Sequence, residues 1–331
     1  MKKNKVLITG VAGLIGSHMA ESLIAKGYDV SGIDNLSGGY KENIPDGVEV
    51  YNGNLDNTKF IDVVFDSVKP DYVYHFAAYA AEGLSPFIRN FNYTNNLICS
   101  VNVINACVKF EVKKIIFTSS MAVYGEGQPP FKETDQPRPE DPYGIAKYAV
   151  EMDLKQACEQ FGLNYAIVRP HNVIGIRQNI WDKYRNVIGI WIRQVLRREA
   201  ITIFGDGNQK RAFSDIKFCL EPMERLMTET NGQIFNIGSD KEYTLNEVAE
   251  IVKALAEEYE FAPEIKHLEA RHEVKFAYSD HTKAKAILGF KDETNLESTI
   301  REMFTWAILQ PDRDIKNMTY EINKGIYKFW K

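Results

Sequence analysis

The stretch KVLITGVAGLIGSH, residues 5–18, decides the fold of this chain. An apolar run, KVLIT (5–9), passes directly into a turn with glycine at every third position: Gly10, Gly13 and Gly16. Glycine allows a sharp turn that can approach a phosphate group, and it lets the following helix pack closely on the strand. The first turn of that helix presents unpaired N–H groups to an anion. The order therefore predicts a strand, a phosphate-binding turn and a helix, the first unit of a parallel α/β sheet.

Strand-like apolar runs alternate with amphipathic helical segments over the first half of the chain. We expect strands at 5–9, 29–34, 48–53, 71–77, 113–119 and 164–170, and helices at 15–26, 92–110 and 143–161. This alternation is typical of right-handed β-α-β crossovers, which place helices on both faces of a parallel sheet. The predicted fold is α/β, with a Rossmann-like, doubly wound parallel sheet.

An acidic residue stands where the second strand is expected to end. Asp34 follows Gly16 by eighteen residues, in GIDNLS (32–37). A carboxylate at this point accepts hydrogen bonds from ribose hydroxyl groups and repels a 2′-phosphate. The nearest cation in sequence is Lys41, and no arginine lies close. Together with the glycine turn this predicts NAD rather than NADP as the cofactor, although Asp34 alone also suits a plain turn after a strand.

The pattern loosens after residue 170. The elements expected there are a helix at 186–198, a strand at 200–205, a helix that begins with a capping box of Thr244 and Glu247, and a short helix ended by Gly289. We predict an NAD-binding Rossmann domain at 1–170 and, at 171–331, mainly a smaller C-terminal α/β substrate-binding lobe over the carboxyl ends of the strands. Segments around 212–240 are expected to return to the first domain.

A tyrosine and a lysine lie four residues apart in PEDPYGIAKYAVEM (139–152). On an α-helix Tyr143 and Lys147 share a face, about 6 Å apart along the axis. A phenol has a pKa of about 10, and lowering it by roughly three units takes about 4 kcal/mol, which an ammonium and the positive nicotinamide of NAD can supply. A serine after the fifth strand, Ser119 or Ser120, is expected at the same sheet edge. Tyrosine and lysine at this spacing also occur in ordinary amphipathic helices.

Composition excludes several classes of function. The 331 residues include 40 basic and 45 acidic side chains, so no broad cationic face is expected for nucleic acid or a membrane. The first apolar run is too short for a signal peptide, and no later run would span a bilayer, so we expect a cytoplasmic protein. The cysteines and histidines lack the spacing of a metal site, so we expect free thiols, no disulfide and no metal.

Motifs along nearly the whole chain resemble those of the extended short-chain dehydrogenase/reductases. They are, in order, TGVAGLIGSH, DNLSGG, HFAA, FTSSMAVYGE, PYGIAKYAVE, RPHNVIG, YRNVIGI, IFGDGNQKRAF, FNIGS and RHEVKFAYSDHTKAK. Within that group the chain is most similar to the NAD-dependent epimerase/dehydratase family, in the branch closest to the UDP-glucose 4-epimerases. The resemblance implies tightly bound NAD, a nucleotide-sugar substrate of the UDP-hexose type, and a homodimer formed through the helices at 92–110 and 143–161.

The resemblance also implies a reaction in two halves. Tyr143 would remove the proton of the 4-hydroxyl group while a hydride passes from C4 of the sugar to nicotinamide. The 4-keto sugar would then turn, and the hydride would return to its other face. Ser120 would hydrogen-bond O4, and Lys147 would hold the nicotinamide ribose and lower the pKa of the phenol.

The binding residues follow from the matched motifs. Those implied for NAD are Gly10, Gly13, Leu14, Ile15, Gly16, Asp34, Asn35, Asn54, Leu55, Phe76, Ala77, Ala78, Asn95, Tyr143, Lys147 and Pro170. Those implied for the substrate are Ser120, Asn172, Asn186, Phe204, Arg211 and Arg271. Asn172 would contact the diphosphate or sugar, Phe204 would pack on uracil, and the arginines would bind phosphate. From the residues alone, Phe204 can equally be a core residue, and either arginine can belong to a surface ion pair.

Two positions separate the reactions of the family. Dehydratases and decarboxylases of nucleotide sugars usually carry acidic residues at one or both of the two positions after the serine, whereas this chain has Met121 and Ala122 there. The pattern favours epimerisation, with a C4 dehydrogenase or a dehydratase as the alternative. A non-catalytic NAD-binding regulator is disfavoured because such proteins commonly lack the Ser-Tyr-Lys set.

The chain departs from the family pattern at four places. Ala80 stands where a lysine usually contacts the cofactor, and Asn54 replaces an aspartate that faces adenine. The segment FSDIKFC (213–219) replaces the usual FSYIDDV. Ala277 aligns with a position where a bulkier residue limits the substituent at C2 of the sugar. From Ala277 we expect N-acetylated or otherwise enlarged sugars to be accepted.

Overall fold

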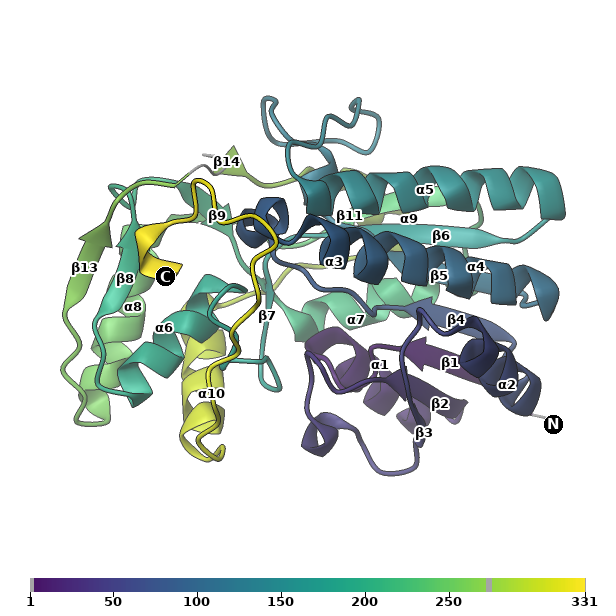
Figure 1. Cartoon of the computed structure of the whole chain (residues 1–331), viewed down its shortest axis with the longest axis horizontal. Coiled ribbons are helices and arrows are strands. Elements are labelled where there is room, and N and C mark those ends of the chain that lie inside the picture. The colour runs from purple at the N-terminus through teal and green to yellow at the C-terminus, as the bar shows by residue number, and fades with distance from the viewer. Residues whose placement is uncertain (1–2, 272–275, 331) are drawn as a thin grey trace.

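The computed structural model describes residues 3–271 and 276–330. For Phe276 and Ala277 it describes the backbone alone. A seven-stranded parallel sheet in the order β11-β6-β5-β4-β1-β2-β3 lies at its centre, with helices on both faces (Figure 1). Its strands are β1 (Lys5–Thr9), β2 (Asp29–Asp34), β3 (Glu49–Asn52), β4 (Tyr72–His75), β5 (Lys114–Thr118), β6 (Tyr165–Pro170) and β11 (Gln233–Ile237). The predicted Rossmann-like fold is confirmed, and the strand order reverses at β1 and β4, where such sheets bind ligands.

Alternate side chains of the strands point to opposite faces, and each face carries its own core. Leu7 and Ile115 belong to one cluster, and their neighbours Val6 and Ile116 belong to the other. The first face is covered by α2 (Thr58–Val68), α4 (Cys99–Lys109) and α5 (Pro142–Phe161). The second is covered by α1 (Leu14–Ala25), α7 (Ile216–Arg225) and α9 (Thr282–Leu288). The helix expected at 92–110 begins earlier, as α3 (Arg89–Tyr93), and joins α4 through a π-helical turn (Thr94–Ile98).

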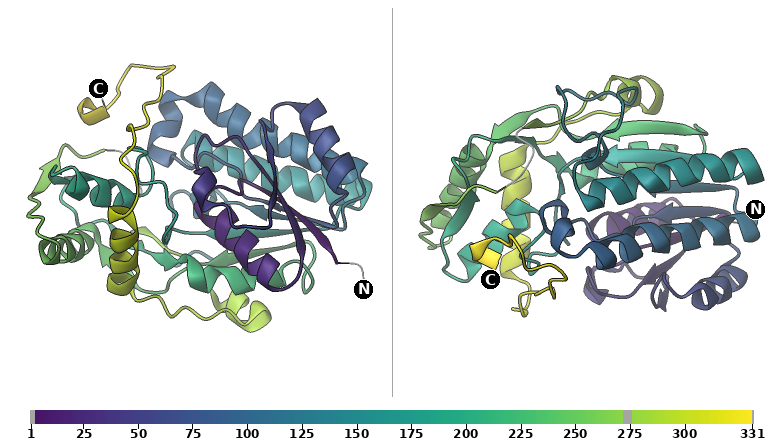
Figure 2. Two further views of the ribbon diagram at one scale, coloured as in Figure 1. Left: turned by 90° about the horizontal axis from the view of Figure 1, so that it is seen from below. Right: turned by 45° about the horizontal axis from the view of Figure 1, so that its top comes forward.

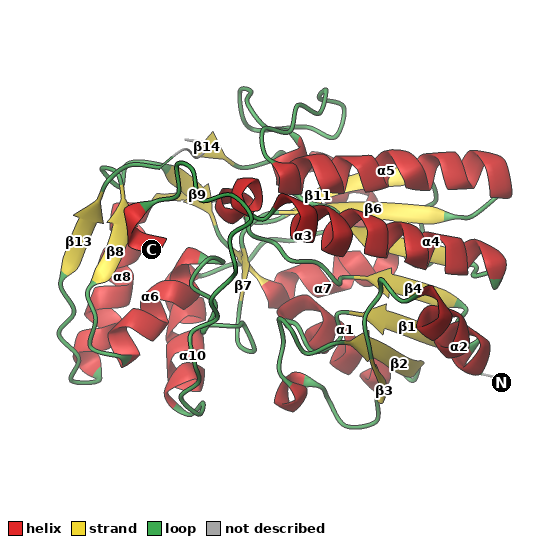
Figure 3. Cartoon of the chain, in the orientation of Figure 1, coloured by secondary structure: helices red, strands yellow, loops and turns green. Residues whose placement is uncertain are grey.

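The remaining elements form a smaller group beside the carboxyl ends of the parallel strands (Figures 1 and 3). Its helices are α6 (Val187–Leu196), α8 (Leu245–Glu258) and α10 (Leu296–Ile308), which share a third core. Its strands form three small sheets: β8 (Ile201–Phe204) with β13 (Ile265–Leu268); β9 (Lys210–Ala212) between β12 (Glu242–Thr244) and β14 (Phe276–Ala277); and β7 (Val173–Ile174) with β10 (Ser214–Asp215).

Local signals placed several boundaries correctly. The capping box of Thr244 and Glu247 begins α8, and Gly289, in a left-handed conformation at φ 62°, ends α9. Strand β11 was missed as an element. It pairs with β6 at the edge of the central sheet, within the segment 212–240 that we expected to return there. The division of the chain at residue 170 stays a prediction.

After α10 the chain continues as residues 309–330, which we call the strap; it is irregular except for a short 3₁₀ helix at Lys328–Trp330. It crosses between the central sheet and the smaller group of elements and ends beside β8, on the side away from β13 (Figures 1 and 2). Two of its side chains, Ile326 and Trp330, are buried in a fourth cluster with Leu84 and Phe87. None of the helices in the described part of the chain combines the length and the apolar character that crossing a membrane requires.

Candidate active site

The glycine turn is packed so tightly that side chains are excluded at two of its positions. A Cβ atom on Gly16 would lie 2.2 Å from the carbonyl oxygen of Gly10, so α1 rests directly on the turn. A Cβ atom on Gly10, whose φ is +75°, would lie 2.8 Å from the backbone nitrogen of Ala77 after β4. Gly13 precedes α1 and provides no side-chain cap, so the first N–H groups of this helix face a turn that an anion can approach.

Asp34 ties the end of β2 to this turn. Its carboxylate accepts hydrogen bonds from the N–H groups of Ala12 (2.9 Å) and Leu36 (2.8 Å), and these oppose the increase in pKa that burial causes. Beside it, the amide nitrogen of Asn35 donates to the amide oxygen of Asn54 (2.7 Å), the residue that replaces the usual aspartate.

Several of the other residues predicted to bind NAD lie at the carboxyl ends of other strands of the central sheet. Phe76, Ala77 and Ala78 follow β4, and Pro170 ends β6. Asn95 lies in the π-helical turn and donates to the amide oxygen of Asn96 (3.3 Å).

The three residues predicted to be catalytic lie together. Tyr143 and Lys147 are 5% and 2% exposed on α5, and the ammonium lies 5.8 Å from the centre of the phenol ring. The ammonium of Lys147 donates to the carbonyl oxygen of Thr118 at the end of β5 (2.7 Å). Of the two candidate serines, Ser120 hydrogen-bonds Tyr143, whereas the hydroxyl of Ser119 donates to the buried carboxylate of Glu151.

The pKa values in this site differ from the sequence-based expectation. Burial, Glu82 and Asp141 raise the pKa of Tyr143, although the hydrogen bond from Ser120 opposes the rise. Burial also lowers the pKa of Lys147 to about 7, against the attraction of Glu151. The lysine alone therefore does not turn the phenol into a base, because desolvation disfavours the charged form of both side chains.

Sequence reasoning missed a buried ion pair behind Lys147. Glu151 receives two hydrogen bonds from the guanidinium of Arg169 (2.9 and 2.5 Å), and the two residues are 4% and 1% exposed. The guanidinium also lies 4.7 Å from the centre of the Tyr124 ring. A signal was available, since Tyr143, Lys147 and Glu151 follow one another at intervals of four residues on one helix face.

Two cations lie beside Tyr79, the residue before the unusual Ala80. The guanidinium of Arg185 and the ammonium of Lys316 lie 4.7 and 4.8 Å from the centre of the Tyr79 ring. Arg185 also pairs with the fully buried Asp182 (3.0 Å). Lys316 comes from the strap, so residues far apart in sequence bring positive charge to the end of β4.

The predicted substrate residues form two groups. Asn172 and Asn186 flank β7 and donate to the carbonyl oxygens of Ala212 (3.0 Å) and Val173 (3.2 Å). In the other group the guanidinium of Arg271 lies 4.4 Å from the centre of the Phe204 ring.

The remaining predicted substrate residue, Arg211, is next in sequence to Ala212, whose carbonyl oxygen accepts from Asn172. Arg211, on β9, donates to the carbonyl oxygen of Lys210 (2.8 Å). The side chain of Ala277 lies outside what the structure describes. Asp215, in the segment that departs from the family pattern, caps α7 through the N–H of Lys217 (2.9 Å) and accepts from Thr299 on α10 (2.8 Å). The departure at 213–219 thus has a structural role.

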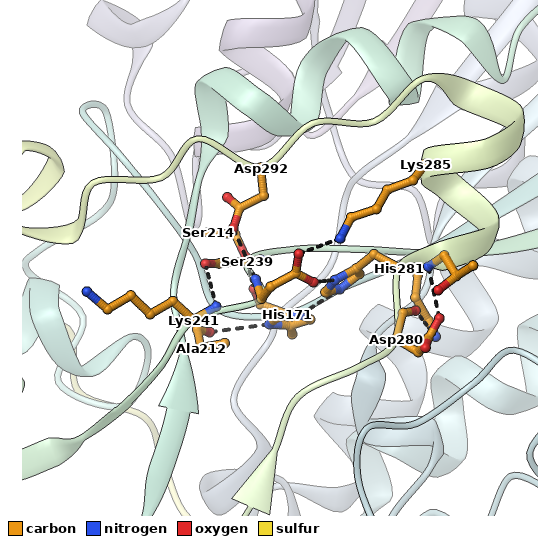
Figure 4. A network of polar contacts seen from close by, with 12 residues as sticks. His171, Ala212, Ser214, Ser239, Lys241, Asp280, His281, Lys285 and Asp292 are labelled. Atoms are coloured by element: carbon orange, nitrogen blue, oxygen red, sulfur yellow. Dashed lines mark hydrogen bonds and ion pairs between the residues drawn. The ribbon is translucent and has the colours of Figure 1, made fainter.

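A histidine pair holds the end of β6 to the start of α9 (Figure 4). The Nε2 atoms of His171 and His281 lie 3.0 Å apart, and Nδ1 of His281 lies 2.7 Å from the carboxylate of Asp240, which also pairs with Lys285. Both rings are buried. Burial and the neighbouring His281 lower the pKa of His171 to about 3.

We expect this pair to make the protein sensitive to mild acid. The unfolded chain binds a proton on His171 at about pH 6.5, whereas the folded chain does so only near pH 3, so the contribution to stability is complete above pH 6.5 and is lost as the pH falls toward 3. His171→Asn should weaken the pH dependence of the urea unfolding midpoint between pH 7.5 and 5. Part of that dependence should remain, because burial also lowers the pKa of His75 to about 3. The exposed His267→Asn is the control, and an unaltered pH slope in the His171 variant would contradict the expectation.

Comparison with known proteins gives consistent results. The model of the NAD dependent epimerase/dehydratase family matches residues 6–238. A UDP-glucose 4-epimerase from Halalkalibacterium halodurans is 30% identical over 91% of this chain and 95% of its own length. The structure of a Thermotoga maritima UDP-glucose 4-epimerase with UDP-glucose is 32% identical, covers 92% of this chain and 98% of its own, and has a TM-score of 0.86. That of a Methanobrevibacter ruminantium UDP-N-acetylglucosamine 4-epimerase is 32% identical, covers 93% and 99%, and has a TM-score of 0.84.

Proposed function

Because the chain belongs to the NAD-dependent epimerase/dehydratase family, we propose that it is a nucleotide-sugar 4-epimerase acting on a UDP-hexose of the UDP-glucose and UDP-galactose type. The main support is the convergence of Ser120, Tyr143 and Lys147 at the carboxyl end of β5, which β4 separates from β1 and its glycine turn. A sugar hydroxyl placed there meets a phenol, a serine hydroxyl and an ammonium, which are the groups that a reversible proton transfer needs.

The residues around the glycine turn fit NAD, the cofactor of this family. The turn has no room for a side chain at Gly10 or Gly16, so its backbone can approach a pyrophosphate, and Asp34 offers carboxylate oxygens to a ribose. When bound, NAD supplies an acceptor and donor of hydride. The positive charge of its oxidised ring, placed beside Tyr143, would add to that of Lys147 and oppose the desolvation that raises the pKa of the phenol.

Each protein group then has one task. Tyr143 accepts the proton of the 4-hydroxyl group and later returns it to the 4-keto oxygen on the other face of the sugar. Ser120 hydrogen-bonds the phenol and can hold the same sugar oxygen. Lys147, with a pKa of about 7, carries a charge that favours the phenolate at and below neutral pH.

A second candidate is a C4 dehydrogenase or a dehydratase. An elimination needs a further acid or base, and the charge of Glu82 acts on Tyr143, so one carboxylate lies near the phenol. Against this, the side chains directly after Ser120 are Met121 and Ala122, neither of which transfers protons. A regulator that binds NAD without catalysis is a weaker alternative, because the three catalytic groups lie together.

A panel of nucleotide sugars tests the proposal. We expect UDP-glucose to be converted to UDP-galactose, identified by NMR, with no lasting rise in absorbance at 340 nm. Net reduction of NAD would support a dehydrogenase, an elimination product would support a dehydratase, and no conversion of any sugar would refute the enzymatic proposal. From Ala277 we also expect UDP-N-acetylglucosamine to be epimerised, so an undetectable rate with it would refute that part.

We further propose a homodimer formed through α4 and α5. Large apolar side chains are exposed on α5 and in the turn before α4: Ile145 at 41%, Met152 at 58% and Phe161 at 65% on α5, and Ile98 at 48% in that turn. Packing a second copy against them would bury this apolar surface in a four-helix contact. Light scattering should give twice the mass of one chain, and Met152→Lys should shift it toward the monomer, with the exposed Leu309→Lys as control. A monomeric wild-type protein would contradict the dimer.

A further inference from the structure

The strap is held to both parts of the molecule by main-chain hydrogen bonds. The N–H of Lys316 donates to the carbonyl oxygen of Trp181 (2.9 Å), on the way to α6. The N–H groups of Glu321 and Ile322 both donate to the carbonyl oxygen of Phe87 (2.9 and 3.2 Å), in the short helical turn that precedes α3. The strap is therefore a fixed part of the fold along this path.

Side chains fix the far end of the strap as well. The Tyr320 hydroxyl donates to the carbonyl oxygen of Trp330 (2.8 Å) and lies 2.8 Å from the hydroxyl of Tyr184. The Trp330 ring is 3% exposed and meets the rings of Phe87 and Tyr184 edge-on, at centroid distances of 6.2 and 5.3 Å. Burial of this indole anchors the residues next to it.

These anchors place two further aromatic rings against Phe204. The Phe329 ring lies 5.6 Å from it at 85°, and the Tyr327 ring lies 6.5 Å from it at 54°. The guanidinium of Arg271 covers the same ring at 4.4 Å. We call Phe204, Arg271, Tyr327 and Phe329 the aromatic group. Phe329 is the most open of its members, with 41% of its surface exposed.

The aromatic group lies close to the groups proposed to react. A Cβ atom on Gly83 would lie 3.7 Å from the Trp330 ring and 4.0 Å from the Arg271 guanidinium. Two residues further along the same turn, the Ser85 hydroxyl accepts a hydrogen bond from the N–H of Tyr143 (3.2 Å). One short turn thus connects the end of the strap with the start of the catalytic helix.

The chemistry of the aromatic group suits a planar heterocycle joined to phosphate. Aromatic rings offer faces and edges on which a base can stack, and a guanidinium can both stack and bind phosphate. We propose that the strap forms one wall of the site for the base of the nucleotide sugar, with Tyr327 and Phe329 lying beside Phe204 along the edge of the base. The proposal rests on the proposed function, to which it adds a determinant of nucleotide recognition.

Variants of the two strap rings test this wall. For Phe329→Ala and for Tyr327→Ala we expect the Kd of UDP and the KM of UDP-glucose to rise about tenfold, the usual effect of losing one stacking ring, with kcat and NAD affinity unchanged. Phe329→Tyr should restore wild-type affinity. Tyr259→Ala removes a similarly exposed ring (37%) at the end of α8 and should change neither constant.

The outcomes separate this inference from the proposed function. Unchanged UDP affinity in both alanine variants overturns the wall, and so does tighter binding, since the strap would then obstruct the site. If the wild-type protein binds UDP but converts no sugar, the proposed function fails. In that case the wall is still supported if the alanine variants weaken UDP binding. A wild-type protein that does not bind UDP overturns both.

Discussion

Replacing Tyr143 with phenylalanine is expected to lower kcat about 1,000-fold, a loss of about 4 kcal/mol of transition-state stabilisation. The change removes one hydroxyl group and keeps the buried ring, so the packing of α5 and the binding of NAD should persist. Without the hydroxyl, the 4-hydroxyl proton of the sugar has no acceptor, and Ser120 cannot replace it because an unassisted serine is a far weaker base. Rates of UDP-galactose formation, with NAD binding measured separately, check this result.

The matched control is Tyr148→Phe, which alters a half-buried tyrosine one turn further along the same helix. It should leave kcat within a factor of about two. Turnover of the Tyr143 variant near the wild-type rate would end the assignment of the phenol as proton acceptor, whatever its effect on stability.

Glu151→Gln is expected to destabilise the folded protein by about 3–5 kcal/mol, the usual effect of leaving a buried charge without its partner. The charge of Arg169, a residue that is only 1% exposed to solvent, would then have lost its partner. A second consequence concerns Lys147, since the pKa of its ammonium, already lowered to about 7, loses the support of the Glu151 carboxylate and falls further. Urea unfolding measures the first effect, and the pH dependence of kcat measures the second.

Two further variants make the test of Glu151 specific. Glu159→Gln alters an exposed glutamate of α5 that lies 3.9 Å from Lys155, and such surface pairs contribute less than about 1 kcal/mol. In the double variant Glu151→Leu, Arg169→Met neither charge remains, so much of the lost stability should return. Equal stability of Glu151→Gln and the wild type would show that the ion pair does not matter.

The central sheet could be predicted because its physical signals are local. Each of the six expected strands lies within its predicted range. The inner strands are buried on both faces and form continuous apolar runs between turns, whereas β3, at the edge of the sheet, is mostly exposed. Strand β11 escaped because QIFNI is interrupted by two polar residues, Gln233 and Asn236, and only its pairing with β6 makes it part of the sheet. The strap escaped for a related reason. It has no periodic pattern, and its anchors at Phe87 and Trp181 lie far away in sequence.

The candidate site also combines features that local sequence signals predict with features that depend on contacts between distant residues. Motif spacing brought Ser120, Tyr143 and Lys147 together correctly, because one helix and one strand end position all three. The lowered phenol pKa was expected with NAD bound and stays a prediction; in the protein by itself burial raises this pKa, which spacing alone does not reveal. Glu151 and Arg169 lie on different elements, so their pairing depends on how α5 packs against β6. The predicted roles of the binding residues stay predictions.

The cap of α5 has a consequence for how Tyr143 works. The carboxylate of Asp141 accepts hydrogen bonds from the N–H groups of Tyr143 (2.8 Å) and Gly144 (3.0 Å), so a fixed negative charge already occupies the positive end of this helix. The backbone can therefore lend little help to a phenolate. Under the proposed mechanism, the basicity of the phenol would depend on Lys147 and on the positive nicotinamide ring, so Tyr143 would be a strong base only while that ring is oxidised.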